Sequence, residues 1–564
     1  MSGSRDNSGS TLVACCGQAP WLRRGLGPEF SARLKLRSKF ILVISAVLRS
    51  ASCALLKAGR PSAIVVLGAL CWSASPALLA DTLITNARII DGTGSAAVLG
   101  SVRLAGDRIT AVGELTPHES DEIIDAGGLV LAPGFIDTHS HSDRLILTER
   151  DALAKITQGI TTAVVGQDGD APYPLADFFA ALEATPAKVN IAAYAGHNTL
   201  RNEVMDADFK RTANEDEINA MSALLEQELA AGALGLSTGL EYEPGIHSET
   251  REVLQLAQLT ADAGGRYISH VRSEDRWFED ALEEIIEIGR MTGMPVQISH
   301  LKLAMASLWG RADDILAKLN AAREEGIDLT ADLYPYTYWQ SNMMVLLPER
   351  DPLDVAAIDF VMAELAPPDG IIFTHFPAEP SYVGMTLTDI ATAREQRPSE
   401  AFSALAQLSI ALGAATGEMG DMMIGTSMRD DDIAAFMAWP HTNICTDGSL
   451  RDRHPRGAGS FPRVLGHYVR EQSVLTLEGA IHRMTGLAAQ HMGFAERGVV
   501  APGMMADLVL FNPDTVRDRA TTSEPFAPSK GIHSVWVSGE RVLNEGNVSE
   551  AFPGRVIRRV SAES

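Results

Sequence analysis

Two histidines separated by a single residue, His139 and His141, directly follow an apolar stretch that ends in Phe135-Ile136-Asp137. Side chains two residues apart on a β-strand point to the same side of the sheet, so both imidazoles can reach one ion. Imidazole nitrogens bind zinc and related divalent metals. The pattern therefore predicts a pair of metal ligands at the end of a strand, whereas a lone histidine is more often a surface or core residue.

Two further histidines extend this pattern. His270 and His300 each follow an Ile-Ser pair, and each stands where a β-strand is expected to end. One helical stretch separates them, which is the spacing of successive strands in an α/β barrel. We expect four imidazoles from three strand ends to converge on zinc or a similar metal, with four unrelated histidines as the alternative.

The segment that must position these residues, about 135–490, alternates short apolar runs with helical stretches. Strands are predicted at 161–165, 188–194, 234–237, 265–269 and 295–299, and helices at 215–231, 252–263 and 280–291. Such alternation implies parallel βαβ units. The prediction is an α/β fold, a TIM-like (β/α)8 barrel whose active site gathers at the C-terminal ends of its strands. An open doubly wound sheet is the alternative, but no Gly-rich phosphate loop follows the first strand.

Three regions depart from this alternation. Residues from about 339 to 425 are irregular and are expected to form an insertion or a lid over the site. Residues 81–134 and 491–564 have the alternating pattern and Gly-containing turns of β-hairpins. Because isolated hairpins are only marginally stable, the two ends are expected to form one small β-sandwich domain.

The first 80 residues differ in composition from the rest, since only Asp6 and Glu29 are acidic among many basic residues. Lys57 and Arg60 precede a short apolar run, and small residues follow up to Ala80. This order is typical of a secretory signal peptide, which predicts cleavage near Ala80 and export, with the periplasm as destination. An uncleaved membrane anchor is the alternative reading, although the apolar run is short for a bilayer span.

Overall composition limits the class of partner. The chain carries a formal net charge of -25, with 46% hydrophobic and 21% charged residues. The acidic surplus argues against nucleic acid or an anionic membrane as the main partner, so a small-molecule substrate and no stable membrane insertion are expected. Cysteine usage agrees with export, because only Cys445 lies beyond the leader and no internal disulfide is expected.

Several longer strings identify a resemblance to a known family. They are the His-Ser-His segment after Pro-Gly-Phe-Ile-Asp-Thr, and the stretches at 235–245, 269–274, 298–302, 332–336 and 454–466. Together they span roughly residues 81 to 550. The chain resembles the amidohydrolase superfamily and, more narrowly, the D-aminoacylases, which are N-acyl-D-amino-acid deacylases. The resemblance implies a metal-dependent barrel with a terminal β-domain, in agreement with the pattern described above.

The resemblance also implies roles for individual residues. His139 and His141 would bind one metal position, and His270 and His300 the other. Asp447 matches the catalytic aspartate, which accepts a proton from the attacking water and returns it to the leaving amine. The alternative for Asp447 is a turn residue that precedes Gly448.

One position departs from the family pattern. Asp168 stands where relatives present a cysteine ligand. A carboxylate can ligate or bridge metal ions, so the site is expected to survive with harder ligands and to hold one or two zinc ions or another divalent metal. The alternative is that Asp168 is an ordinary loop carboxylate.

The remaining implied contacts concern the substrate. Tyr242, Lys302 and Arg456 match positions that hold the substrate carboxylate in relatives, although either cation is also a candidate for a structural ion pair. The sequence thus predicts hydrolysis of the amide bond of N-acyl-D-amino acids, giving a carboxylate and a free D-amino acid. Dipeptide or cyclic-amide hydrolysis, and a barrel without catalysis, remain alternatives. The oligomeric state stays open.

Overall fold

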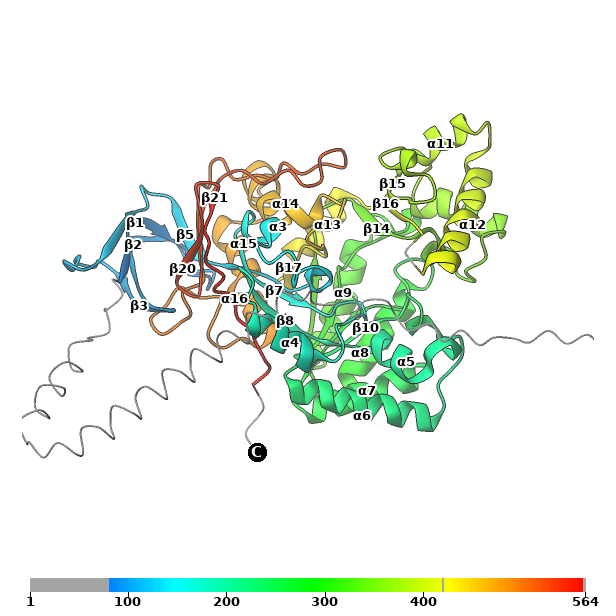
Figure 1. Cartoon of the computed structure of the whole chain (residues 1–564), viewed down its shortest axis with the longest axis horizontal. Coiled ribbons are helices and arrows are strands. Elements are labelled where there is room, and N and C mark those ends of the chain that lie inside the picture. Colours follow the sequence, from blue (N-terminus) through cyan, green and yellow to red (C-terminus); the bar gives the residue numbers. More distant parts are fainter. Residues whose placement is uncertain (1–80, 418–419, 561–564) are drawn as a thin grey trace, which may run out of the picture. The chain divides into compact units, whose positions relative to one another are not determined.

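The computed structural model describes residues 81–560 apart from 418–419, and Figure 1 shows their arrangement. The predicted signal peptide, its cleavage point and the four leader cysteines lie outside the described residues. Among the described helices, none combines the length and the apolar character needed to cross a bilayer.

Eight parallel strand positions form the barrel. β6 (Phe135–Asp137), β7 (Ile160–Val165) and β8 (Asn190–Ala193) pair in one sheet, and β8 continues almost directly into β9 (Ala195–Gly196). The second sheet runs in the order β9, β10 (Gly235–Gly239), β11 (Arg266–His270), β12 (Val296–Ile298), β13 (Leu329–Leu333) and β17 (Thr442–Ile444). A parallel bridge between Ser140 and Gly448 joins the segments that follow β6 and β17, which closes the ring. The predicted (β/α)8 fold is confirmed.

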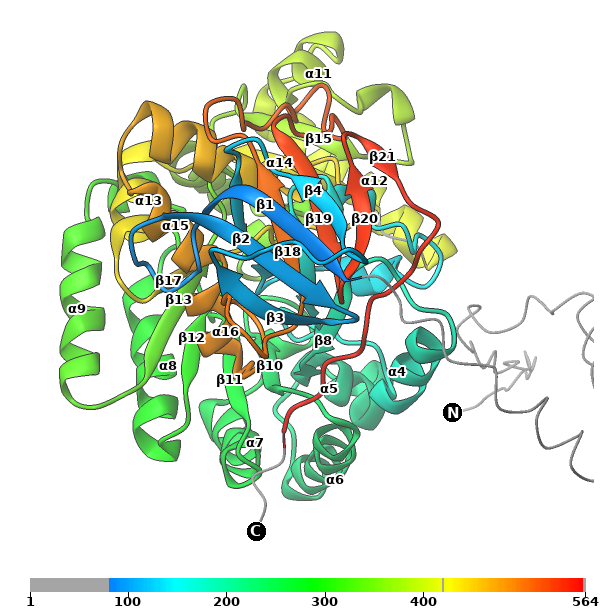
Figure 2. The same cartoon turned by 90° about the vertical axis from the view of Figure 1, so that its left-hand side faces the viewer.

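Helices connect the strands and surround the barrel (Figure 2). They are α3 (Leu153–Ile156), α4 (Leu175–Ala184), α5 (His197–Met205), α6 (Glu215–Ala231), α7 (Thr250–Asp262), α8 (Phe278–Thr292), α9 (Ala312–Glu324), α13 (Asp430–Ala438), α14 (Arg456–Arg463), α15 (Leu477–Met484) and α16 (Gly486–Met492). Helix α6 has the bounds that the sequence predicts, because local signals define both of its ends. The Asn214 side chain accepts a hydrogen bond from the Glu217 amide at 3.0 Å, Glu217 returns the contact to the Asn214 amide, and Gly232 ends the helix at φ +109°.

The two ends of the described chain form a β-domain with one continuous nine-stranded sheet. Its strands are β1 (Thr82–Ile89), β2 (Val98–Ala105), β3 (Arg108–Gly113), β4 (Glu122–Asp125), β5 (Val130–Pro133), β18 (Leu508–Phe511), β19 (Ile532–Val537), β20 (Glu540–Asn544) and β21 (Asn547–Val548). The pairing of β5 with β18 joins the N-terminal and C-terminal parts. Trp536 is fully enclosed in the apolar core of this domain, together with Ile84, Leu104 and Leu508.

An insertion separates β13 from α13. It contains β14 (Tyr338–Ser341), α10 (Val355–Phe360), β15 (Ile371–His375), α11 (Leu387–Ala393), α12 (Pro398–Thr416) and β16 (Met422–Thr426). The three strands form an antiparallel sheet in the order β14-β16-β15, with Phe373 and Met423 buried. This sheet lies outside the barrel ladder, which explains why the sequence loses its strand–helix alternation here.

Candidate metal centre and active site

The C-terminal ends of five barrel strands carry the site residues that the sequence predicts. His139 and His141 follow β6, Asp168 follows β7, His270 ends β11, and His300 and Asp447 follow β12 and β17. Three of them have left-handed backbone conformations, with φ of +55° at Asp168, +37° at His300 and +47° at Asp447. Such conformations persist only where surrounding contacts hold them, and they are concentrated at functional sites.

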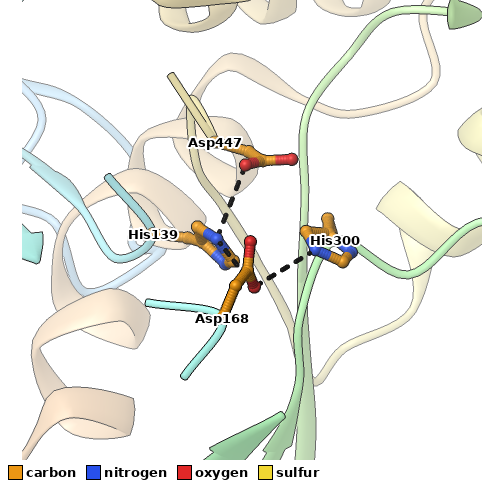
Figure 3. A group of neighbouring side chains, drawn as sticks. All are labelled: His139, Asp168, His300 and Asp447. Atoms are coloured by element: carbon orange, nitrogen blue, oxygen red, sulfur yellow. Dashed lines mark ion pairs between the residues drawn. The ribbon is translucent and has the colours of Figure 1, made fainter. Parts of the chain in front are cut away.

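Four of these side chains form a tight cluster around Asp168 (Figure 3). Asp168 Oδ1 lies 3.4 Å from Nε2 of His139 and 3.4 Å from Nε2 of His300. Its other oxygen is 3.3 Å from His141 Nε2. Asp447 Oδ1 lies 3.5 Å from His139 Nε2 and 3.3 Å from His141 Nε2. Asp168 thus contacts imidazoles from both halves of the predicted ligand set.

This donor set fits a divalent metal. Ligand atoms about 2.1 Å from a tetrahedral ion lie about 3.4 Å from one another, which is the spacing found here. Both ring nitrogens of His139 and Oδ1 of Asp168 are buried without a hydrogen-bond partner among the described residues. Buried polar atoms of this kind need a partner, and a cation supplies one. Imidazole and carboxylate ligands suit zinc and similar borderline metals.

His270 lies at the edge of this cluster. Its Nδ1 is 3.0 Å from His300 Nε2, and its Nε2 is 3.0 Å from a carboxylate oxygen of Glu241. With Glu274 and His300 it forms a second group whose ligand atoms are close enough to hold an ion. The structure therefore brings all four predicted histidines together. His270 and His300 share one group, as the resemblance implied, and His300 also belongs to the group around Asp168.

Electrostatics keep the carboxylates of the cluster ionised. Burial alone lowers the pKa of His139, but the charges of Asp168 and Asp447 outweigh it and raise this pKa well above its usual value. Burial raises the pKa of Asp168, yet His139 and His300 hold it well below the usual range. The pKa of Asp447 is also held low, because Arg456 and the imidazoles outweigh its burial. Ionised carboxylates are what both metal binding and proton acceptance require.

Asp332, which sequence reasoning did not assign to the site, supports the cluster from β13. Its Oδ1 accepts a hydrogen bond from the His300 amide at 2.7 Å and lies 3.7 Å from His139 Nδ1. Gln297 donates to its other oxygen at 2.7 Å. Carboxylates behind ligating histidines commonly orient the rings. Asp332 belongs to the stretch at 332–336 that carries the family resemblance, but its contact with His139 forms only when the barrel closes.

The predicted substrate residues also lie at the site, and two of them have protein partners there. Arg456 donates to the carboxylate of Asp447 and lies over the Tyr334 ring, 4.6 Å from its centroid. Lys302 donates to Glu274 and contacts His300 Nδ1 at 2.8 Å. The ring of Tyr242 packs against His270 with centroids 4.3 Å apart. Tyr334, which sequence reasoning did not assign to the site, also lies here. Its buried hydroxyl has no hydrogen-bond partner among the described residues.

A cavity of about 560 Å³ opens onto this cluster. Barrel residues form one side, including His141, Asp168, Tyr242, Lys302, Asp447 and Arg456. The insertion forms another side, with Trp339, Met344, Val345, Leu346, Leu365, Ile410 and Met422. The insertion therefore contributes a largely apolar lining, together with Gln340, Ser341, Asn342 and Arg350, to a cavity that the polar and charged barrel residues also line.

Comparison with known proteins agrees with this geometry. The model of the amidohydrolase family matches residues 122–359 and 379–543. The chain belongs to the amidohydrolase family. It is 36% identical over 510 residues to the D-aminoacylase of Alcaligenes xylosoxydans xylosoxydans, covering 86% of this chain and 98% of that protein. It is also 36% identical to the N-acyl-D-glutamate deacylase of the same organism, covering 85% and 96% of the two chains.

The chain is also similar to a solved structure over most of its length. The N-acyl-D-glutamate deacylase of Bordetella bronchiseptica, complexed with zinc and a phosphonate inhibitor that mimics the tetrahedral intermediate, matches with a TM-score of 0.75. The two proteins are 37% identical, and the match covers 85% of this chain and 99% of that one. The resemblance found in the sequence is confirmed, and the chain is a hydrolase of carbon–nitrogen bonds other than peptide bonds.

Proposed function

We propose that the protein hydrolyses N-acyl-D-amino acids in a metal-dependent reaction, releasing a carboxylic acid and a D-amino acid. The observation that carries this proposal is the cluster of His139, Asp168, His300 and Asp447, the last three of which line a cavity together with Lys302 and Arg456. It joins a cation site and an ionised carboxylate to positive charges suited to an anionic substrate. The relatives named above are deacylases of D-amino acids.

The metal would be held by the imidazoles of His139, His141, His270 and His300, with Asp168 between them. Asp168 would share in holding the metal, because one of its oxygens lies 3.4 Å from both His139 and His300 and the other lies 3.3 Å from His141. A divalent ion bound here supplies a Lewis acid, which activates water and polarises a carbonyl.

Asp447 is the group positioned to move the proton. Its carboxylate is nearly enclosed, is held ionised, and faces the same space as His139 and His141. It can accept a proton from the attacking water and pass it to the amine that leaves, which is otherwise too basic to depart. Arg456 donates to its second oxygen and so fixes its orientation.

The substrate carboxylate finds donors on the same side of the cavity. Nε of Arg456 and the hydroxyl of Tyr334 are buried and have no hydrogen-bond partner among the described residues. With Lys302 and Tyr242, they offer charged and neutral donors among the residues that line the cavity. An anchored carboxylate would fix the stereocentre relative to the metal, which is how such a site can distinguish D from L substrates. The largely apolar lining that the insertion contributes suits an apolar substituent, and we propose that the insertion acts as a lid.

A substrate panel tests the proposed function. We expect the zinc-loaded protein to hydrolyse N-acetyl-D-leucine with a kcat/KM at least about 100-fold above that for N-acetyl-L-leucine, because only one configuration places the amide at the metal with the carboxylate anchored. Amine release would be followed for both enantiomers, for D- and L-glutamate derivatives, for a dipeptide and for a hydantoin. Inert D-acyl compounds together with a cleaved dipeptide or ring would refute the proposal.

We further propose that the protein is exported to the periplasm. The proposal is supported by the order of basic, apolar and small residues within 1–80. Cell fractionation of a host that expresses the full chain is expected to give a periplasmic protein that begins near Asp81. A full-length product that remains in the cytoplasm would contradict it.

A further inference from the structure

A buried ion pair lies next to the loop 446–448, which carries Asp447. Lys155, on α3, and Asp137, at the end of β6, both have side chains that are 0% exposed. The ammonium group of Lys155 donates to Asp137 Oδ2 at 2.8 Å, to Thr446 Oγ1 at 2.8 Å and to the Gly448 carbonyl at 3.0 Å. Its three donors are therefore all used, and two of them hold the residues on either side of Asp447.

Thr446 joins this pair to the loop. Its hydroxyl donates to Asp137 Oδ2 at 2.7 Å and accepts from the Gly448 amide at 3.1 Å. Its own amide donates to Asp137 Oδ1 at 2.8 Å. We call Asp137, Lys155 and Thr446 the buried cluster. It fixes the backbone immediately before and after Asp447 against the strand that leads to His139.

Asp447 needs such support because of its backbone. At φ +47° it occupies a left-handed conformation that residues other than glycine rarely adopt. Its amide donates to the His139 carbonyl at 2.9 Å, and the His141 amide donates to the Gly448 carbonyl at 3.2 Å. The loop is thus bonded to the His139–His141 segment on one side and to the buried cluster on the other.

The buried cluster does not itself touch the cavity, since none of its three members lines it. A buried ion pair is also a poor source of net stability, because desolvation of two charges offsets their attraction. A requirement for fixed geometry explains it better. We propose that Asp137, Lys155 and Thr446 are positioning residues that hold the Asp447 carboxylate in register with the metal ligands. This inference rests on the proposed function, in which Asp447 transfers the proton.

Thr446 offers a cleaner test than Lys155 or Asp137. Removal of either charged side chain would leave the other one buried and unpaired. The Thr446→Val substitution keeps the shape and removes only the hydroxyl. We expect kcat to fall about 10- to 100-fold with KM within about three-fold of wild type, because displacement of a catalytic group by a fraction of an ångström to 1 Å has effects of this order. Thr446→Ser, which keeps the hydroxyl, is expected to restore kcat to within about three-fold.

A control of the same residue type lies on β17, the strand that precedes Thr446. Thr442 is also buried, and its hydroxyl donates to the Phe436 carbonyl at 2.8 Å, away from the cavity. Thr442→Val is expected to lower the melting temperature less than Thr446→Val, because its hydroxyl makes one hydrogen bond and that of Thr446 makes three, while kcat stays near that of wild type. Zinc content and melting temperature would be measured for each variant beside kcat and KM on N-acetyl-D-leucine.

Three outcomes would overturn the inference: an unchanged kcat in Thr446→Val, an equal loss in Thr442→Val, or a loss that follows missing zinc. Failure of the proposed function is distinct from these, because the wild-type protein would then fail to hydrolyse any N-acyl-D-amino acid in the panel.

Discussion

The Asp447→Asn protein is expected to lose about 10³-fold or more in kcat while retaining its zinc. Asparagine has the size of aspartate and can keep the contact with Arg456, but it cannot accept a proton from water near neutral pH. His139, His141, Asp168, His270 and His300 would still be present to bind the metal, so the loss should fall on chemistry rather than on metal content. Steady-state kinetics on an N-acyl-D-amino acid, with zinc analysis of the same sample, measures both quantities.

Asp432 provides the control for this substitution. Its carboxylate is also buried, but it accepts hydrogen bonds from the Gly310 amide at 2.9 and 3.1 Å, and Asp432 does not line the cavity. Asp432→Asn is expected to keep kcat near that of wild type. An Asp447→Asn protein within about ten-fold of wild type would remove Asp447 from proton transfer, and a zinc-free variant would reassign it as an essential ligand.

Removal of the metal is expected to have an equally large effect. Dialysis against a chelator should lower kcat/KM by more than about 10³-fold, because Lewis-acid activation then disappears while the substrate contacts remain. Zinc should restore activity, and Mg²⁺ should not, because an imidazole-rich ligand set suits zinc. The melting temperature should fall as well, since a ligand at about 1,000 times its Kd stabilises the folded state by about 4 kcal/mol.

Metal analysis must accompany this experiment. Activity would be plotted against zinc bound per chain, with the untreated and the zinc-restored proteins as references. Full activity in a protein shown to be metal-free would exclude a metal-dependent reaction. It would also leave unexplained why buried atoms of His139 and Asp168 have no hydrogen-bond partner within the described part of the chain.

Local signals made much of the barrel predictable from sequence. The His139–His141 pair follows an apolar strand. Side chains two residues apart on a strand point to the same side, which is sufficient to predict that both rings reach one ion. Both bounds of helix α6 were predictable, because Asn214 caps its N-terminus and Gly232 ends it. The insertion was recognisable only as a loss of alternation, because its strands pair with one another and leave no repeating pattern.

The contacts across the barrel could not be predicted in this way. Asp332 and His139 are distant in sequence, and their approach to 3.7 Å depends on closure of the ring. The sequence left Arg456 open as a substrate ligand or an ion-pair partner, and only the folded structure shows that its partner is Asp447. The family resemblance assigned His300 with His270 to one metal position, and the structure brings these two residues together with Glu274 while His300 also contacts Asp168.

Zinc-edge anomalous scattering from crystals of the zinc-loaded protein tests the central claim most directly. The account predicts at least one strong peak about 2.0–2.2 Å from a carboxylate oxygen of Asp168 and from the Nε2 atoms of His139 and His141. A second ion, if bound, should lie between Asp168 and the His270 and His300 rings. Fully loaded crystals with no peak within reach of Asp168, or with zinc bound only elsewhere on the protein, would contradict it.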